Sequence, residues 1–111
     1  MNKLFDIKFL QEALDFLDGL DEKSRTKIIY NIDKSRYTKD PKLLKKLNNE
    51  IWEFRTRFSK KQYRLLAFWD KRDNEETLII ATHGFIKTSK KINKNEIKKA
   101  EELMKEYLDD D

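Results

Sequence analysis

The sequence predicts an α+β fold: an N-terminal helical hairpin packed on a twisted antiparallel sheet of three or more strands, plus a C-terminal helix. Apolar residues recur with helical spacing before residue 36 and after residue 93. Three segments between residues 51 and 83 carry strand patterns, and short polar loops separate them. The chain has 111 residues, which suits one hydrophobic core, so we expect residues 1–111 to form one domain.

The first 36 residues predict the helical hairpin. One helix covers residues 6–18 and ends at Gly19, and Asp21 caps a second helix that runs to about Arg36. The short link makes the two helices antiparallel neighbours. Their apolar stripes contain Leu10, Ala13, Leu14 and Leu17 in the first helix and Ile28, Ile29 and Ile32 in the second.

Pro41 separates the hairpin from the predicted sheet. It disfavours helix at the preceding residue, and we expect residues 43–47 to form only a short turn. Residues 51–58 alternate between one face with aromatic residues and one with charged residues, which is typical of a half-buried strand. Residues 63–69 are apolar on both faces and predict a central strand, and residues 77–83 predict a third.

The predicted loops set the register of the sheet. A four-residue turn at 59–62 pairs Arg57 with Arg64, and a six-residue loop at 71–76 places His83 beside Arg64. The two arginines and the histidine then form a row across one face. A slip of one residue in either hairpin would destroy the row, because it turns one strand over. The same face would carry Glu53 and Arg55.

Residues 93–108 predict the last helix. Asn93 followed by Glu96 resembles a capping box at its start, and the acidic tail at 109–111 is unfavourable at a helix C-terminus and should fray. The apolar stripe contains Ile97, Ala100, Leu103, Met104, Tyr107 and Leu108. This stripe packs on the protein's own core in the simplest interpretation. In the alternative, the helix is mobile or shares its apolar face with a partner.

Composition and charge restrict the classes of protein. With 12% aromatic residues and clear apolar runs, the chain should fold, and without cysteine it has neither disulfides nor thiolate metal sites, which suits the cytoplasm. No apolar run approaches the roughly 18 residues of a membrane span, and charges interrupt the N-terminus, so we expect no signal peptide and no membrane partner. Residues 34–99 contain 19 Lys and Arg against 8 Asp and Glu, which indicates a polyanion-binding surface or simply a solvated, lysine-rich one.

His83 is the only histidine, and it precedes a segment that contains Lys87, Lys90 and Lys91. Arginines with a histidine can bind a phosphodiester and can cleave RNA without a metal. The histidine moves a proton, and the arginines stabilise charge on the phosphate. No residues have the spacing of metal ligands or of a glycine-rich phosphate loop, so we expect no metal and no cofactor. The competing interpretation is a structural histidine with strand arginines paired to acids such as Glu53.

Three segments resemble the RelE/ParE toxin superfamily, in its HigB-like, phage-related branch. These segments are IWEFRTR at 51–57, QYRLLAFW at 62–69 and THGFIK at 82–87, which continues through Glu96, Ile97 and Ala100. The resemblance covers about residues 5–108. It implies a compact α/β fold and a toxin of a type II toxin–antitoxin module, and it implies metal-independent cleavage of mRNA, usually on the ribosome, by 2′-hydroxyl attack. It also implies a helix-turn-helix antitoxin, with operator DNA bound only through the toxin–antitoxin complex.

The resemblance also implies roles for single residues. The catalytic positions would be Arg55, Arg64, His83 and Lys87, and the RNA-binding positions would be Arg57, Tyr63, Phe85, Lys90 and Lys91. The chain departs from the branch at Thr88, where a second lysine is frequent, and at Asn93, where a proline is frequent. Two other functions stay open. One is a ParE-like inhibitor that binds gyrase, because fold does not determine function, and the other is a non-catalytic module that binds nucleic acid or a partner.

Overall fold

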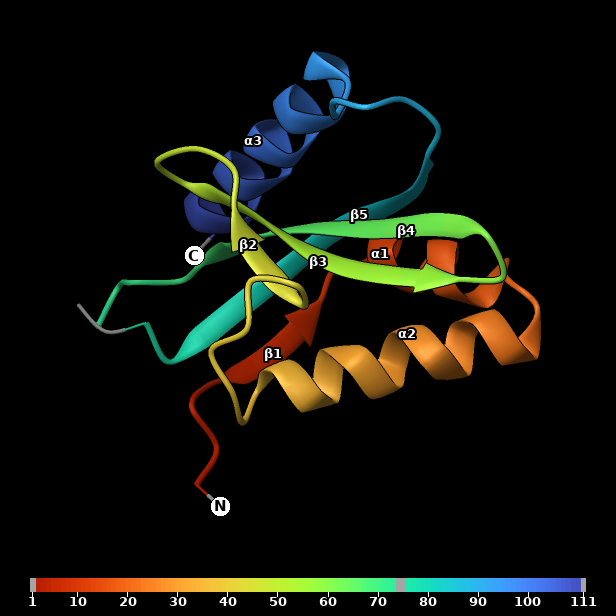
Figure 1. Ribbon diagram of the computed structural model, residues 1–111. Coiled ribbons are helices and arrows are strands. Elements are labelled where there is room, and N and C mark those ends of the chain that lie inside the picture. The colour runs from red at the N-terminus through yellow and green to blue at the C-terminus, as the bar shows by residue number, and fades with distance from the viewer. Residues whose placement is uncertain (1, 74–75, 111) are drawn as a thin grey trace.

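A five-stranded sheet with helices on both faces forms the protein (Figure 1). The computed structural model describes residues 2–73 and 76–110. The elements are β1 (Asp6–Phe9), α1 (Gln11–Asp18), α2 (Glu22–Ser35), β2 (Leu44–Lys46), β3 (Ile51–Phe58), β4 (Lys61–Trp69), β5 (Leu78–Lys87) and α3 (Lys94–Asp109). The strand order is β1-β5-β4-β3-β2, and only β1 runs parallel to its neighbour. The predicted α+β class is confirmed.

The predicted first helix is wrong over its first residues. Residues 6–9 form β1, whose Asp6 pairs with Leu78 at the open edge of β5. Ile7 and Phe9 pack against the core, whereas Asp6 and Lys8 are exposed, and this alternation is the period of a strand. Pairing with β5 satisfies backbone groups that a helix would satisfy internally, so the tertiary contact decides the conformation. The helix α1 then begins at Gln11.

The segment predicted as a short turn contains a strand. Leu44–Lys46 forms β2, which pairs antiparallel with β3 and places Leu44 opposite Phe54. Leu44 packs against the core on the side of α1 and α2. A turn does precede the strand, because the backbone oxygen of Asp40 accepts hydrogen bonds from the N–H groups of Leu43 and Leu44.

The hairpin between β3 and β4 is tighter than predicted. Its loop has two residues, Ser59 with φ 52° and Lys60 with φ 66°, and Phe58 pairs with Lys61. Two left-handed residues give the turn a twist that matches the twist of the strands. The predicted four-residue turn is therefore wrong, and Arg64 lies opposite Arg55 rather than Arg57.

An irregularity in β5 sets the direction of His83. Leu66 pairs with His83 and Ala67 pairs with Ala81, so Thr82 is an extra residue in the strand. The bulge places Ile80 and His83 on the same face although three positions separate them, and both lie on the side of α3. The strand also continues to Lys87, four residues beyond its predicted end.

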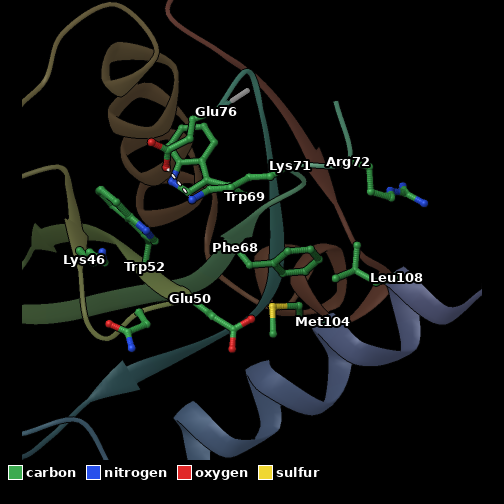
Figure 2. A pocket seen from close by; sticks show the side chains of 11 residues that line it. Lys46, Glu50, Trp52, Phe68, Trp69, Lys71, Arg72, Glu76, Met104 and Leu108 are labelled. Atoms are coloured by element: carbon green, nitrogen blue, oxygen red, sulfur yellow. Dashed lines mark ion pairs between the residues drawn. The ribbon is translucent and has the colours of Figure 1, made fainter. Parts of the chain in front are cut away.

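The sheet separates two apolar cores. One lies under α1 and α2 and contains Ile28 and Phe54, and the other lies under α3 and contains Phe68, Ile80 and Ala100. Figure 2 shows Phe68 beside Met104 and Leu108 of α3. The predicted packing of the last helix on the protein's own core is therefore confirmed. No helix in the described ranges is long and apolar enough to cross a membrane.

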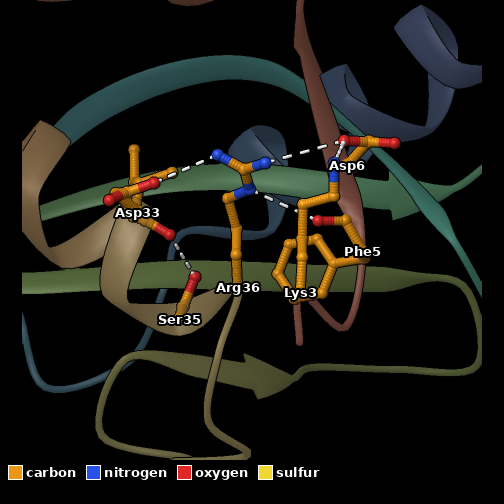
Figure 3. A network of polar contacts seen from close by, with 7 residues as sticks. Lys3, Phe5, Asp6, Asp33, Ser35 and Arg36 are labelled. Carbon is orange, nitrogen blue, oxygen red and sulfur yellow. Dashed lines mark hydrogen bonds and ion pairs between the residues drawn. The ribbon is translucent and has the colours of Figure 1, made fainter. Parts of the chain in front are cut away.

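Arg36 fastens the end of α2 to β1. Its Nη1 lies 3.0 Å from the carboxylate of Asp33, its Nη2 lies 3.6 Å from Asp6, and its Nε donates to the backbone oxygen of Phe5 at 3.3 Å (Figure 3). The backbone oxygen of Arg36 also accepts from the N–H of Leu4 at 2.7 Å. These contacts hold the parallel edge strand in place.

Candidate nucleic-acid interface

Three rows of side chains cross the sheet on the face that α3 partly covers. Strand pairing gives the rows Glu53–Leu66–His83, Arg55–Arg64–Phe85 and Arg57–Gln62–Lys87. The predicted row of Arg57, Arg64 and His83 is wrong for two reasons. The turn between β3 and β4 is shorter than expected, and the register of β4 with β5, which includes the extra residue Thr82, places Phe85 opposite Arg64. The three residues still share this face. We call the set Arg55, Arg57, Lys87, Lys90 and Lys91 the cationic face.

Arg64 is buried on this face of the sheet and forms an ion pair with Glu53. The Nε of Arg64 lies 2.9 Å from Oε1 of Glu53, and the two side chains are 3% and 6% exposed. Its Nη2 donates to Oε1 of Gln62 at 2.8 Å, and its Nη1 donates to the backbone oxygen of Tyr63 at 3.0 Å. Burial lowers the pKa of the Arg64 guanidinium, and the carboxylate of Glu53 opposes this shift. Arg64 therefore binds protein groups, and only a rearrangement would bring it to a phosphate.

The remaining cations of the face are open to solvent. Arg55 is 32% exposed, lies 3.9 Å from Oε2 of Glu53 and donates to the backbone oxygen of Pro41 at 3.3 Å. Arg57 is exposed, and Lys87 is half-buried at the end of β5. In the part of the chain that the structure describes, neither of these two side chains makes an ion pair. The exposed Lys90 and Lys91 follow in the loop before α3.

His83 lies under the start of α3 and is 3% exposed. Its Nε2 is 3.1 Å from Oε1 of Glu96, and its Nδ1 is 3.1 Å from the hydroxyl of Thr82. Because a carboxylate only accepts, we assign the proton of the neutral ring to Nε2. Burial lowers the pKa of His83, while Glu96 opposes the shift, so the ring is neutral at physiological pH. The neutral ring can accept a proton only at Nδ1, which faces Thr82, so its action as a base at Nε2 needs both a movement of Glu96 and a shift of the ring proton to Nδ1.

The two predicted aromatic contacts occupy different faces. Phe85 is half-buried on the cationic side, and its ring centroid lies 6.0 Å from that of His83. Tyr63 lies on the opposite face, is 3% exposed and donates from its hydroxyl to Ser24 at 3.1 Å. The structure therefore brings Phe85 to the cationic face and places Tyr63 in the core under α2.

Sequence reasoning missed two residues that control this site, Gln62, which it places in a turn, and Glu96. The competing interpretation, in which strand arginines pair with acids such as Glu53, is confirmed for Arg64, although the pair is buried and not at the surface. Glu96 was assigned to a capping box, whereas Asn93 caps α3 through the N–H of Asn95 and the carboxylate of Glu96 binds His83. The signal for Glu53 was its alternation with Arg55 along β3. The described residues contain no group of three or more His, Cys, Asp or Glu placed to hold a metal ion.

Comparison with known families gives one match over most of the chain. The family described as "Phage derived protein Gp49-like (DUF891)" matches residues 15–105. The chain belongs to this Gp49-like family. A comparison with curated proteins gives no match. The segment matched to the Gp49-like family runs from α1 into α3, so it includes the cationic face, His83 and Glu96.

Proposed function

We propose that this protein is the toxin of a type II toxin–antitoxin module and a RelE/HigB-like endoribonuclease. It would cleave mRNA, on the ribosome, without a metal and so inhibit translation. A helix-turn-helix antitoxin would neutralise it, and the pair would bind operator DNA. Membership of the Gp49-like family is consistent with such a toxin. The observation that carries the proposal is the cationic face, with Arg55, Arg57 and Lys87 on one side of the sheet.

The geometry supports phosphodiester binding at this face. Neighbouring strands lie about 4.8 Å apart and adjacent rows lie about 7 Å apart along a strand, so the long side chains of Arg55, Arg57 and Lys87 can contact one phosphate or two successive ones. Arginine binds phosphate through two parallel N–H groups, and Lys87 adds a point charge. Phe85, beside them, offers a ring on which an unpaired base can stack. No sequence readout follows from these contacts.

The proposed reaction needs one proton acceptor and one proton donor. The 2′-oxygen of the substrate attacks the adjacent phosphorus, the bond from phosphorus to the 5′-oxygen breaks, and a 2′,3′-cyclic phosphate and a 5′-hydroxyl result. His83 would take the 2′-hydroxyl proton at Nε2 once Glu96 has moved and the ring proton has passed to Nδ1, beside the hydroxyl of Thr82. Arg55 and Lys87 would stabilise the charge on the phosphorane, and the ammonium of Lys87 would give a proton to the 5′-oxygen as it leaves. Arg64 would contact the phosphate only if its ion pair with Glu53 broke, and otherwise its hydrogen bond orients Gln62.

A reconstituted translation system tests the cleavage. Purified wild-type protein should cut ribosome-bound messenger, and a 2′-deoxy nucleotide at the mapped position should prevent the cut. Arg55→Ala and Lys87→Ala should each reduce the cleavage rate by about 10²-fold or more, as loss of a transition-state donor does. Lys23→Ala, which removes an exposed charge on α2, is the matched control and should leave the rate unchanged. Intact messenger at protein concentrations that saturate ribosomes would contradict the proposal.

One observation favours a second candidate, a module that binds RNA without cutting it. Arg64 and His83 are both buried and both have protein partners, so two of the four proposed catalytic groups are not free. A non-catalytic protein would bind messenger through the exposed cations alone. The same assay separates the two functions, because such a protein would shift the messenger in a gel and leave it intact.

A further inference from the structure

A second candidate surface lies on the other side of the sheet, at the edge that β2 forms. A cavity of about 600 Å³ opens there, within the range of roughly 300–1,000 Å³ typical of ligand sites. Its apolar walls come from β2, β3, β4 and the segments that precede β1 and β2. They are Leu4, Phe5, Pro41, Leu44, Trp52 and Trp69. We call this cavity the tryptophan groove.

A smaller cavity extends the tryptophan groove. It has a volume of about 440 Å³ and shares Lys46, Trp52, Trp69 and Glu76 as walls. Figure 2 shows Trp52 and Trp69 side by side, with Lys46 and Glu76 at their margin. The two tryptophans therefore form a wall between two hollows, of which the smaller reaches Phe68, Met104 and Leu108 on the side of α3. Leu4, at the outer wall, is 42% exposed, although it is a large apolar residue.

The aromatic rings of the groove stand at right angles to one another. Trp69 meets Phe5 at 5.1 Å and 86°, and it meets Trp52 at 5.9 Å and 85°. Edge-to-face packing fixes the rings and leaves no slot between parallel faces. A nucleobase stacks on the face of a ring, whereas an aliphatic side chain fits an irregular apolar hollow. The ring geometry therefore favours an aliphatic anchor.

Trp69 also offers a hydrogen bond. Its indole Nε1 is buried and has no hydrogen-bond partner among the described residues. An indole N–H only donates, so its partner in a complex would be a carbonyl or carboxylate oxygen. A peptide supplies both kinds of acceptor.

The rim of the groove is positively charged. Lys39, Lys45 and Lys46 line it, although Lys45 pairs with Glu53 and so projects from the face that carries Arg55. All three are exposed, and none makes an ion pair within the described ranges. Of the two acids of the rim, Glu76 lies 3.6 Å from Lys71, whereas Asp40 accepts from the backbone N–H of Lys42 at 2.9 Å and keeps its charge. The three lysines therefore outnumber the single acid without a cationic partner. Unpaired lysines around an apolar hollow complement a ligand with carboxylates around an apolar side chain.

We propose that the tryptophan groove binds an acidic segment of a protein partner. One aliphatic side chain of the segment enters between Leu44, Trp52 and Trp69, an acceptor of the segment takes the indole N–H, and its carboxylates lie against the lysines. Trp52 and Arg55 project from opposite faces of β3, so the segment leaves the cationic face open. The inference does not depend on RNA cleavage.

Selection from a displayed library of random 12-residue peptides tests this surface. The wild-type protein is the target, and peptides that also bind the variant Lys39→Glu/Lys46→Glu are removed. Selected peptides should contain an aliphatic residue flanked by Asp and Glu, and the variant should weaken their binding at least tenfold. The matched control, Lys23→Glu/Lys34→Glu, changes the net charge equally on exposed positions of α2 and should bind them like the wild type.

The two tryptophans report where a peptide binds. They are the only tryptophans of the chain, and both line the groove, so indole N–H signals in NMR spectra should shift and saturate with the selected peptide. Neutral or basic selected peptides, or binding without an indole shift, would overturn the proposal. A single-stranded oligouridylate that shifts both indoles would overturn it in favour of RNA. Messenger cleavage measured on the Lys39→Glu/Lys46→Glu variant distinguishes this surface from the cationic face, because it should be unchanged.

Discussion

Gly84 shows how one residue without a side chain fixes the position of a helix. A Cβ atom at this position would lie 2.2 Å from Cδ2 of Phe16 and 2.7 Å from its Cγ, so the ring of α1 packs directly on the backbone of β5. Gly84→Ala should lower the free energy of unfolding by about 1–3 kcal/mol, which is typical of overpacking. Chemical denaturation measures this change.

Gly19 provides the matched control for that substitution. A Cβ there would meet nothing closer than 3.5 Å, and its φ of −78° suits any residue. Gly19→Ala should change stability by no more than about 0.5 kcal/mol. Adding Phe16→Leu to Gly84→Ala should cost less than the two single changes together, because the smaller side chain leaves room for the methyl group. Strict additivity would contradict the proposed clash.

His83 should titrate below the usual range for histidine. Burial lowers its pKa from the ordinary 6.5, and Glu96 only partly opposes this. Because the unfolded chain binds the proton more tightly, the free energy of unfolding should fall as pH drops below about 6.5, by at most about 1.4 kcal/mol per pH unit. Above that pH the contribution is fully present.

The single histidine makes this titration easy to follow. Its ring Cε1–H gives one NMR signal, whose pH dependence yields the pKa directly. Glu96→Gln removes the carboxylate that favours the imidazolium, so this variant should lower the pKa further. An ordinary pKa in the wild type, or a higher pKa in the variant, would show that the ring is not buried under α3 as described.

The sequence predicted which residues share the face of the site better than it predicted which residues they contact. Alternation along β3 placed Glu53, Arg55 and Arg57 on one face, as the structure has them. The partners of Arg64 and His83 could not be predicted in the same way. They depend on a two-residue turn and on the extra residue Thr82, and neither has a sequence signal such as Asn-Gly.

At the scale of elements, patterns with long apolar stripes were reliable. The second and third helices and the three central strands were predicted, because each is long enough to show a repeated apolar stripe, an alternation or a continuous apolar run. The two edge strands were missed. β1 and β2 have four and three residues, so their pattern is too short to distinguish from helix or turn, and only pairing with β5 and β3 creates them.

Substitutions in the hairpin turn between β3 and β4 should stabilise the protein. Ser59 and Lys60 both have positive φ, which costs a residue with a Cβ roughly 1–2 kcal/mol in the left-handed helical region. Ser59→Asn/Lys60→Gly should therefore raise the free energy of unfolding by about 1 kcal/mol, measured in urea. Ser89→Asn/Lys90→Gly is the control, because no residue of that loop has positive φ. An equal gain in the control would show that conformation at the turn is not the cause.

At the scale of the whole molecule, the charge pattern of the sequence predicted that positive charge is unevenly distributed over the surface. The basic middle of the chain supplies β3, β5 and the loop that follows, so Arg55, Arg57 and Lys87 share one face of the sheet, and Lys90 and Lys91 follow in the loop that leads to α3. The same basic middle also supplies Lys39, Lys45 and Lys46, which line a different hollow. Net charge could not distinguish these two surfaces, because only the topology of the sheet assigns each lysine to a face.

The salt dependence of RNA binding tests the cationic face as a unit. Each phosphate contact with a single strand releases counterions and contributes about −0.7 to the slope of log K against log salt concentration. With a 2′-deoxy oligonucleotide, which cannot be cleaved by 2′-hydroxyl attack, Arg57→Gln/Lys87→Gln should reduce the magnitude of the slope by about 1.4. The control Lys23→Gln/Lys34→Gln removes two exposed charges on α2, across the sheet. If the control reduces the slope equally, binding follows net charge and the cationic face is not a site. If only the strand variant does so, phosphates bind the rows that β3 and β5 build.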